Sequence, residues 1–236
     1  MEKVIHRTDS RGRAEHGWLS SRHTFSFAGY YDKERMGFGK LRVVNDDVVA
    51  PGQGFGTHSH DNMEIVSVPL SGSLRHQDSM GNVHVIRNGE IQIMSAGTGI
   101  MHSEYNNSDV EPVNFLQIWV LPKAANIEPR YGQKAITPTT TKNRFQVMVS
   151  PDGRGGSAVI NQDAWFSLAD LDVDTRVSYA LNRAGNGAYF FVIDGAIRLA
   201  GETLNRRDGI GLSGIETVDV LALDESRVLC IEVPMK

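Results

Sequence analysis

Two short pairs of metal-binding residue types stand out in the first half of the sequence. His58 and His60 are separated by one residue, and so are His102 and Glu104. Residues i and i+2 of a β-strand point to the same face, so each pair can present two side chains to one ion. The first pair alone could equally be two hydrogen-bonded histidines. Together the pairs offer three nitrogens and one carboxylate, which predicts one mononuclear site for a first-row divalent metal.

The donor set favours an ion with open coordination positions. Structural zinc sites usually close four ligands around the ion, mostly with thiolates. The sequence has one cysteine, Cys230, which excludes an intramolecular disulfide and lies in an apolar run that predicts a small core residue. An octahedral ion bound by four protein ligands would keep positions free for a substrate and for oxygen.

Other acidic and histidine residues lie near these pairs in the sequence. Glu64 has the strand parity of His58 and His60, so it could be a further ligand, a partner that orients a histidine, or a solvent-facing charge; we favour the orienting role. His76 and His84 flank a predicted turn at 78–82 and are therefore expected at the surface. The remaining histidines have no paired spacing, and we expect structural roles for them: His6, His16 and His23.

The chain is expected to be an all-β protein. Its 24 glycines fall largely between short apolar segments, and several of these segments are rich in Val, Ile and Phe, as strands are. Short helices remain possible around 123–135 and 161–171. Hairpin turns are predicted at residues 78–82, 88–89, 194–195 and 208–209. The expected strands cover residues 41–44, 63–70, 83–86, 91–94, 115–121, 145–149, 189–193, 218–223 and 228–233.

A weak internal repeat suggests a duplicated β domain. Residues 69–75 (PLSGSLR) resemble residues 192–198 (VIDGAIR), and a second turn glycine precedes an apolar strand after each, at Gly89 and Gly209. Similar units at nearly one offset are the signature of duplication. The segment 122–141, rich in Pro, Thr and Lys, is the expected connection between the halves.

Longer motifs around the two pairs resemble those of a known family. Gly54-x3-His58-x-His60-x3-Glu64-x7-Gly72 resembles the first cupin motif, and Gly97-x-Gly99-x2-His102-x3-Asn106 resembles the second. More narrowly, the N-terminal half is similar to the pirin family. The segments that carry this likeness are residues 23–27 (HTFSF), 54–58 (GFGTH), 76–80 (HQDSM), 94–99 (MSAGTG) and 116–119 (LQIW).

The resemblance implies a bicupin fold, with two jelly-roll-like β-barrels packed together and few short helices. We expect an N-terminal metal-binding domain at 1–132 and a C-terminal cupin-like domain at 133–236 that lacks the ligands. The family's metal ligands fall on His58, His60, His102 and Glu104. Ser59 stands where the family usually has proline, which puts the stiffness of that strand in doubt but leaves the ligand pair intact.

The resemblance is closest to bacterial pirin-like proteins with quercetin 2,3-dioxygenase activity. It implies that a flavonol and dioxygen are the substrates, that carbon monoxide is released, and that the ion is iron(II). The donor set itself also accepts manganese, cobalt, nickel, copper or zinc. We expect Glu104, or less favourably Glu64, to take the proton of the flavonol 3-hydroxyl. The alternative is a non-enzymatic, iron-containing regulator that binds a transcription factor in a redox-dependent way.

Composition restricts the other partners. The net charge of −4 and the absence of a Lys/Arg cluster argue against a nucleic-acid surface. No apolar segment is long enough to span a membrane, and the N-terminal residues lack the pattern of a signal peptide. We therefore expect a cytoplasmic protein with no membrane contact, and a monomer is the working expectation.

Overall fold

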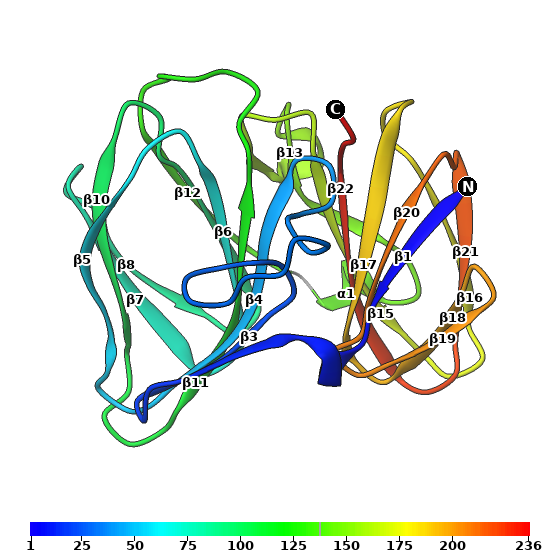
Figure 1. The fold of residues 1–236 in the computed structure, drawn as a ribbon, viewed down its shortest axis with the longest axis horizontal. Coiled ribbons are helices and arrows are strands. Elements are labelled where there is room, and N and C mark those ends of the chain that lie inside the picture. The colour runs from blue at the N-terminus through cyan, green and yellow to red at the C-terminus, as the bar shows by residue number, and fades with distance from the viewer. Residues whose placement is uncertain (137) are drawn as a thin grey trace.

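Short strands separated by turn-forming residues assemble into four sheets, two in each half of the chain. The structure, a computed structural model, describes residues 1–136 and 138–236; Thr137, in the expected connection between the halves, lies outside the described residues. Each half pairs a seven-stranded sheet with a four-stranded sheet (Figure 1). The sheets form open, cupin-like sandwiches rather than closed barrels, and they confirm the bicupin prediction.

The N-terminal half contains the sheets that carry the predicted metal ligands. Its larger sheet has the order β12 (Arg130–Ala135), β9 (Glu90–Ser95), β6 (Glu64–Ser71), β11 (Val113–Val120), β4 (Leu41–Val49), β3 (Leu19–His23) and β2 (Gly12–Glu15). Its smaller sheet has the order β5 (Gly54–His60), β10 (Ile100–Asn106), β7 (Ser73–Asp78) and β8 (Val83–Arg87).

The C-terminal half repeats this arrangement. Its larger sheet has the order β1 (Glu2–His6), β20 (Gly209–Ser213), β17 (Asn186–Asp194), β22 (Ser226–Pro234), β15 (Trp165–Leu171), β13 (Gln146–Ser150) and β14 (Ala158–Val159). Its smaller sheet has the order β16 (Arg176–Ala180), β21 (Thr217–Ala222), β18 (Ala196–Leu199) and β19 (Glu202–Asn205). The helical turns of the described chain are η1 (Thr8–Ser10), α1 (Pro138–Thr141) and η2 (Arg154–Gly156).

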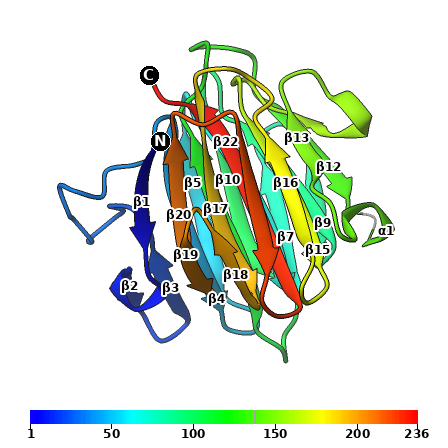
Figure 2. The ribbon, with the colours of Figure 1, turned by 90° about the vertical axis from the view of Figure 1, so that its right-hand side faces the viewer.

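The two halves exchange one strand each. The strand orders match position by position, so β9 corresponds to β20 and β6 to β17, as the sequence repeat predicts. The edge position beside β20 is filled by β1, the first strand of the chain, which is antiparallel to it (Figure 2). The equivalent position beside β9 is filled by β12, which precedes the second repeat. Each half is therefore completed by a strand from outside its own repeat.

The two seven-stranded sheets pack back to back and form the largest hydrophobic core (Figure 1). Alternate residues of each strand point into this interdomain core or into the lumen of their own half. On β11, Leu116 and Ile118 enter the interdomain core, whereas Phe115 packs in the N-terminal lumen. This alternation decides which face every polar residue of β4, β6 and β11 can reach.

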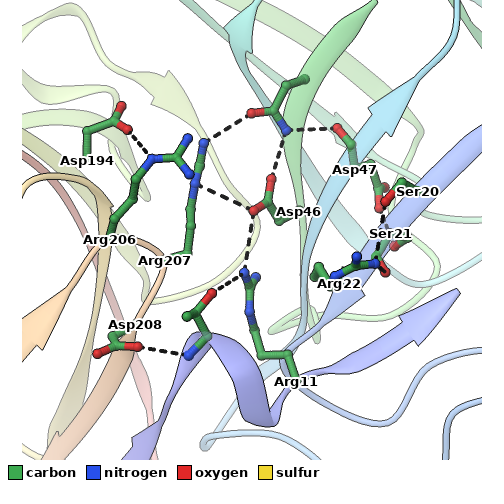
Figure 3. Close-up of polar contacts among 12 residues, drawn as sticks. Arg11, Ser20, Ser21, Arg22, Asp46, Asp47, Asp194, Arg206, Arg207 and Asp208 are labelled. Carbon is green, nitrogen blue, oxygen red and sulfur yellow. Dashed lines mark hydrogen bonds and ion pairs between the residues drawn. The ribbon is translucent and has the colours of Figure 1, made fainter.

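A buried polar cluster fastens the halves to each other beside this core. The carboxylate of Asp46, on β4, lies between the guanidinium groups of Arg11 and Arg207 at 3.5 and 3.6 Å (Figure 3). Asn114 accepts a hydrogen bond from Arg207 and donates one to Asp46. Burial lowers the pKa of both arginines, although both stay charged at neutral pH because an arginine pKa is so high. The next residue, Asp47, points to the opposite face of β4.

Two expectations about local structure were wrong. The segments expected as possible helices contain strands β12 and β15, because each pairs along its length with a neighbouring strand, β12 with β9 and β15 with β22. Residues 78–82 form the predicted β7–β8 hairpin, but the turns at 88–89, 194–195 and 208–209 instead carry the chain from one sheet to the other. No helix among the described residues is long and apolar enough to cross a membrane.

The interface leaves no room for a side chain at Gly211. A Cβ atom there would lie 2.6 Å from two ring carbons of Phe38, which reaches across from the N-terminal half. We expect Gly211→Ala to destabilise the protein by about 1–3 kcal/mol, because the ring must move out of a packed core. Urea unfolding measures this change. Gly29→Ala is the control, since nothing described lies within 4 Å of its Cβ position; equal stability of both variants would contradict the packing.

Candidate metal centre

Three histidines from two neighbouring strands meet in the lumen of the N-terminal half. His102 on β10 pairs directly with His58 on β5, and His60 pairs with Ile100 one step further along. The ring centroids are 4.4 Å apart for His58 and His102, 4.8 Å for His58 and His60, and 5.0 Å for His60 and His102. Candidate ligand atoms of the three residues lie within 4.8 Å of one another. The i, i+2 spacing thus brings His58, His60 and His102 together, whereas Glu104 is grouped with His102 and His76.

The histidine environments favour neutral imidazoles. Burial, together with the neighbouring His58, lowers the pKa of His60 to about 4. Burial and the charges of His58 and His60 lower the pKa of His102 to about 2. Nδ1 of His58 lies 2.8 Å from the carbonyl oxygen of Gly56, which can only accept, so Nδ1 donates this hydrogen bond and Nε2 is the nitrogen left to face an ion. Neutral imidazoles are the form that binds metals.

Glu104 supplies a buried carboxylate beside the histidines. It receives hydrogen bonds from Ser67 (3.2 Å) and from the side-chain amide of Gln117 (2.8 Å). The carbonyl oxygen of that amide accepts a hydrogen bond from the indole of Trp119, which fixes the orientation of Gln117. Burial raises the pKa of Glu104 to about 7; the hydrogen bond from Ser67 opposes this rise and the charge of Asp47 adds to it.

These residues fit a divalent metal ion. His102 is only 2% exposed, so water cannot reach its ring freely. Both of its ring nitrogens nevertheless have no hydrogen-bond partner among the described residues. Buried polar atoms are normally satisfied, so such nitrogens need an explanation. A cation bound through one of them, with His58, His60 and the carboxylate of Glu104 as the other candidate ligands, would provide that explanation.

The structure does not bring Glu64 to the histidines. Its carboxylate accepts hydrogen bonds from Ser95 (2.7 Å) and from the backbone of Asn161 in the C-terminal half (3.0 Å). Glu64 and Ser67 are three residues apart on β6 and therefore point to opposite faces, and Ser67 is the one that contacts Glu104. Shared parity with His58 and His60 was misleading, because those histidines belong to a different strand and sheet.

The expectation that His76 lies at the surface was also wrong. Its side chain is fully buried, whereas His84, directly opposite on β8, is exposed. His76 shares its strand face with the buried Leu74, and this parity could have placed it inside. Candidate ligand atoms of His76, His102 and Glu104 also lie within 4.8 Å of one another, so His76 lies directly behind the predicted ligands.

A cavity of about 350 Å³ opens beside the histidines. His58, His60 and Gln117 line this cavity, and so do His16, which follows β2, and His23, the last residue of β3; both were expected to be structural. Most of the remaining wall is aromatic and apolar. It includes Trp18, Phe27, Phe55 and Trp119, together with the polar residues Ser21, Asn45 and Asp47. A concave, mostly apolar site with a few polar groups is typical of small-molecule binding.

Sequence patterns could have located some of the cavity residues that were missed. Gln117 and Trp119 have the i, i+2 spacing that marked the histidine pairs, and they face the lumen. The sequence could not show that Asp47 lines the cavity. Asp46 and Asp47 are adjacent and have the same side chain, and only the packing of β4 shows which of the two faces the lumen.

Among the residues that the structure describes, the lumen of the C-terminal half carries no counterpart of the ligands. Counted from the turns at Gly72 and Gly195, the position of Glu104 is occupied by Val220, since Val220 pairs with Leu199 as Glu104 pairs with His76. By the same count Ala222 corresponds to Asn106, since Ala222 pairs with Ile197 as Asn106 pairs with Leu74. The lumen is filled by apolar side chains that include Ile197, Leu199, Val220 and Ala222.

The two-domain architecture and the single polar lumen define a bicupin with one candidate metal centre. Residues 5–120 match the family model described as pirin, and residues 147–233 match the model described as the quercetinase C-terminal cupin domain. The chain belongs to the pirin family. It is 42% identical over 234 residues to a quercetin 2,3-dioxygenase of Escherichia coli K12, covering 98% of each chain. It is 36% identical over 225 residues to a pirin-like protein of Caulobacter vibrioides, covering 95% of this chain and 96% of that protein.

Solved structures of a relative agree with this assignment. The structure is similar to that of YhhW from Escherichia coli, with a TM-score of 0.95 and 41% identity over 99% of this chain and 98% of that chain. It is equally similar to the complex of that bacterial pirin with nickel(II), with a TM-score of 0.94, 41% identity and 99% of each chain covered. These findings and the histidine cluster support a divalent metal ion in this protein.

The buried Asp47 makes stability depend on pH. Burial raises its pKa from 3.8 to about 7, so between these values the folded state keeps a proton that the unfolded state releases. Stability should therefore fall as pH rises through this range, by up to about 1.4 kcal/mol per pH unit from this group. Asp47→Asn should remove that part of the slope in urea unfolding of metal-free protein at pH 5 and pH 7. Parallel slopes for the wild type and the variant would contradict the assignment.

Proposed function

We propose that this protein is a metal-dependent dioxygenase that opens the heterocyclic ring of flavonols such as quercetin and releases carbon monoxide. The observation that carries the proposal is the aromatic-lined cavity that opens directly on His58 and His60. Its size lies in the range of sites for small organic ligands. The relatives named quercetin 2,3-dioxygenase support the choice of a flavonol as the ligand.

The cavity has the chemistry to bind a planar, hydroxylated aromatic molecule. Trp18 and Phe55 lie edge to face with ring centroids 5.3 Å apart, and Trp119 lies edge to face against His60 at 4.9 Å. Flat apolar walls of this kind favour a fused aromatic ring system. The few polar groups among them, such as Asp47, would select its hydroxyl positions and orient the ring toward the ligands.

The ion is assigned to His58, His60, His102 and Glu104. When bound, it would act as a Lewis acid that lowers the pKa of the flavonol 3-hydroxyl and makes the flavonolate reactive toward dioxygen. We propose Glu104 as the group that accepts the proton of that hydroxyl, because its buried carboxylate lies within 4.8 Å of a ring nitrogen of His102. Gln117, held by Trp119, keeps the carboxylate in position. Glu64 takes no part in this proposal.

Gas exchange tests the proposed reaction. Protein loaded separately with iron(II), nickel(II), cobalt(II) or manganese(II) is mixed with quercetin, and oxygen consumption and carbon monoxide release are recorded. We expect one carbon monoxide for each oxygen consumed with at least one of these ions. Loaded protein that consumes no oxygen with quercetin or other flavonols would refute the function.

His102→Ala tests the ligand assignment independently of activity. This substitution should abolish stoichiometric metal binding, because His102 is the buried donor at the centre of the cluster. Elemental analysis after dialysis against nickel(II) measures the metal content. His84→Ala is the matched control, since His84 is exposed and should leave the content unchanged. Full occupancy in His102→Ala would exclude the assigned site.

A further inference from the structure

Two residues with no role in the proposed reaction lie directly behind the metal ligands. His76 and Asp78 occupy the lumen face of β7 and are buried. In the register of the sheet, His76 pairs with Glu104 and Asp78 pairs with His102. The rings of His76 and His102 have centroids 5.3 Å apart and are tilted by 45°. His76 and Asp78, on β7, thus lie beside Glu104 and His102 on the neighbouring strand β10.

The carboxylate of Asp78 fixes the tautomer of His76. It accepts hydrogen bonds from the backbone of Met80 (3.0 Å) and from the backbone and side chain of Asn82. Its remaining contact is Nε2 of His76 at 3.1 Å. An ionised carboxylate has no hydrogen to donate, so Asp78 accepts the hydrogen bond from His76. Nε2 of His76 therefore carries the hydrogen, and Nδ1 has a free lone pair.

That lone pair accepts no hydrogen bond from any described residue. Nδ1 of His76 is buried without a hydrogen-bond partner, and both ring nitrogens of His102 share this condition. A neutral imidazole that binds a metal through one nitrogen carries a hydrogen on the other, and this N–H normally needs an acceptor. Both oxygens of Glu104 already accept hydrogen bonds, from Ser67 and Gln117. His76 therefore offers the acceptor that a metal-bound His102 requires.

We propose that Asp78 and His76 form a hydrogen-bonded relay that orients His102 for metal binding, with His76 Nδ1 accepting the ring hydrogen of His102. This inference rests on the proposed ligand role of His102. The charge of Asp78, passed on through His76, makes His102 a stronger donor to the ion. His76 and Asp78 are positioning residues in this arrangement and do not bind the ion themselves.

The surroundings of His76 keep water out of the relay. The ring of Tyr131, on β12, lies 5.0 Å from the ring of His76 and is stacked on His84 at 4.8 Å. Buried groups that cannot exchange with water depend strongly on their fixed partners. His84 is therefore a close control: it is the cross-strand neighbour of His76, it contacts the same tyrosine, and it is exposed.

Metal affinity tests the relay without any flavonol. We compare His76→Phe, which removes the acceptor but keeps a ring, with His84→Phe, using chelator competition for nickel(II) and cobalt(II). We expect His76→Phe to weaken binding by about 10- to 100-fold, the usual cost of losing such a partner, and His84→Phe to leave it unchanged. The unfolding temperature of each metal-free variant shows whether the fold is intact. Unchanged affinity in a folded His76→Phe would overturn the relay.

A second substitution covers the case in which His76→Phe does not fold. Asp78→Asn keeps the shape of the side chain but removes the charge that fixes the tautomer, so it should weaken binding in the same direction. X-ray absorption of the bound cobalt(II) should count the same number of imidazoles in wild type and Asp78→Asn. Loss of an imidazole, or unchanged affinity in Asp78→Asn, would overturn the proposal. A protein that binds metal as expected but cleaves no flavonol would refute the proposed function and leave the relay standing.

Discussion

The alternation of side chains across the seven-stranded sheet of the N-terminal half determines the rest of the structure. One face of this sheet must supply the interdomain core, and the other must wall the lumen that holds the histidines. Because side chains alternate between the two faces of a strand, residues next to each other in sequence reach different surfaces. Asp46 joins the arginines between the halves, and Asp47 faces the cavity. A shift of one residue in β4 would exchange these tasks and disrupt both surfaces.

The same alternation explains how far the sequence could be interpreted. It was enough to place His58 with His60, and His102 with Glu104, on shared strand faces. Short apolar runs located nine of the strands but not β5 and β10, which carry those residues, and the sequence repeat predicted the duplication. Parity within one strand cannot say which sheet the strand joins or which face is inside, so it misplaced Glu64. His76 was misplaced because its position near a turn was weighted above the burial of Leu74 on the same face. Register between strands, which decides all these cases, depends on tertiary packing.

The two halves show how one sandwich can be used for binding or for support. In the N-terminal lumen, apolar clusters around Leu74 and around Ile65 enclose a polar middle layer. In the C-terminal lumen, the equivalent layer is apolar, and the buried Glu232 has a full set of hydrogen bonds with Tyr179, Asn182, Arg183 and Asn186. The nitrogens of His102, unpaired within the described chain, therefore contrast with the fully hydrogen-bonded carboxylate of Glu232.

The exchange of β1 and β12 has a consequence for biosynthesis. Residues leave the ribosome at about 5–20 per second, so Glu2 must wait on the order of tens of seconds before its partner Ser213 exists. The N-terminal sandwich can close earlier, because β12 follows it directly in the chain. The edge of β20 is completed by a strand made long before it, so β1 has no partner until residues 209–213 have been synthesised. A segment that is short and largely polar, as residues 2–6 are, is suited to that delay because it offers little apolar surface for premature association.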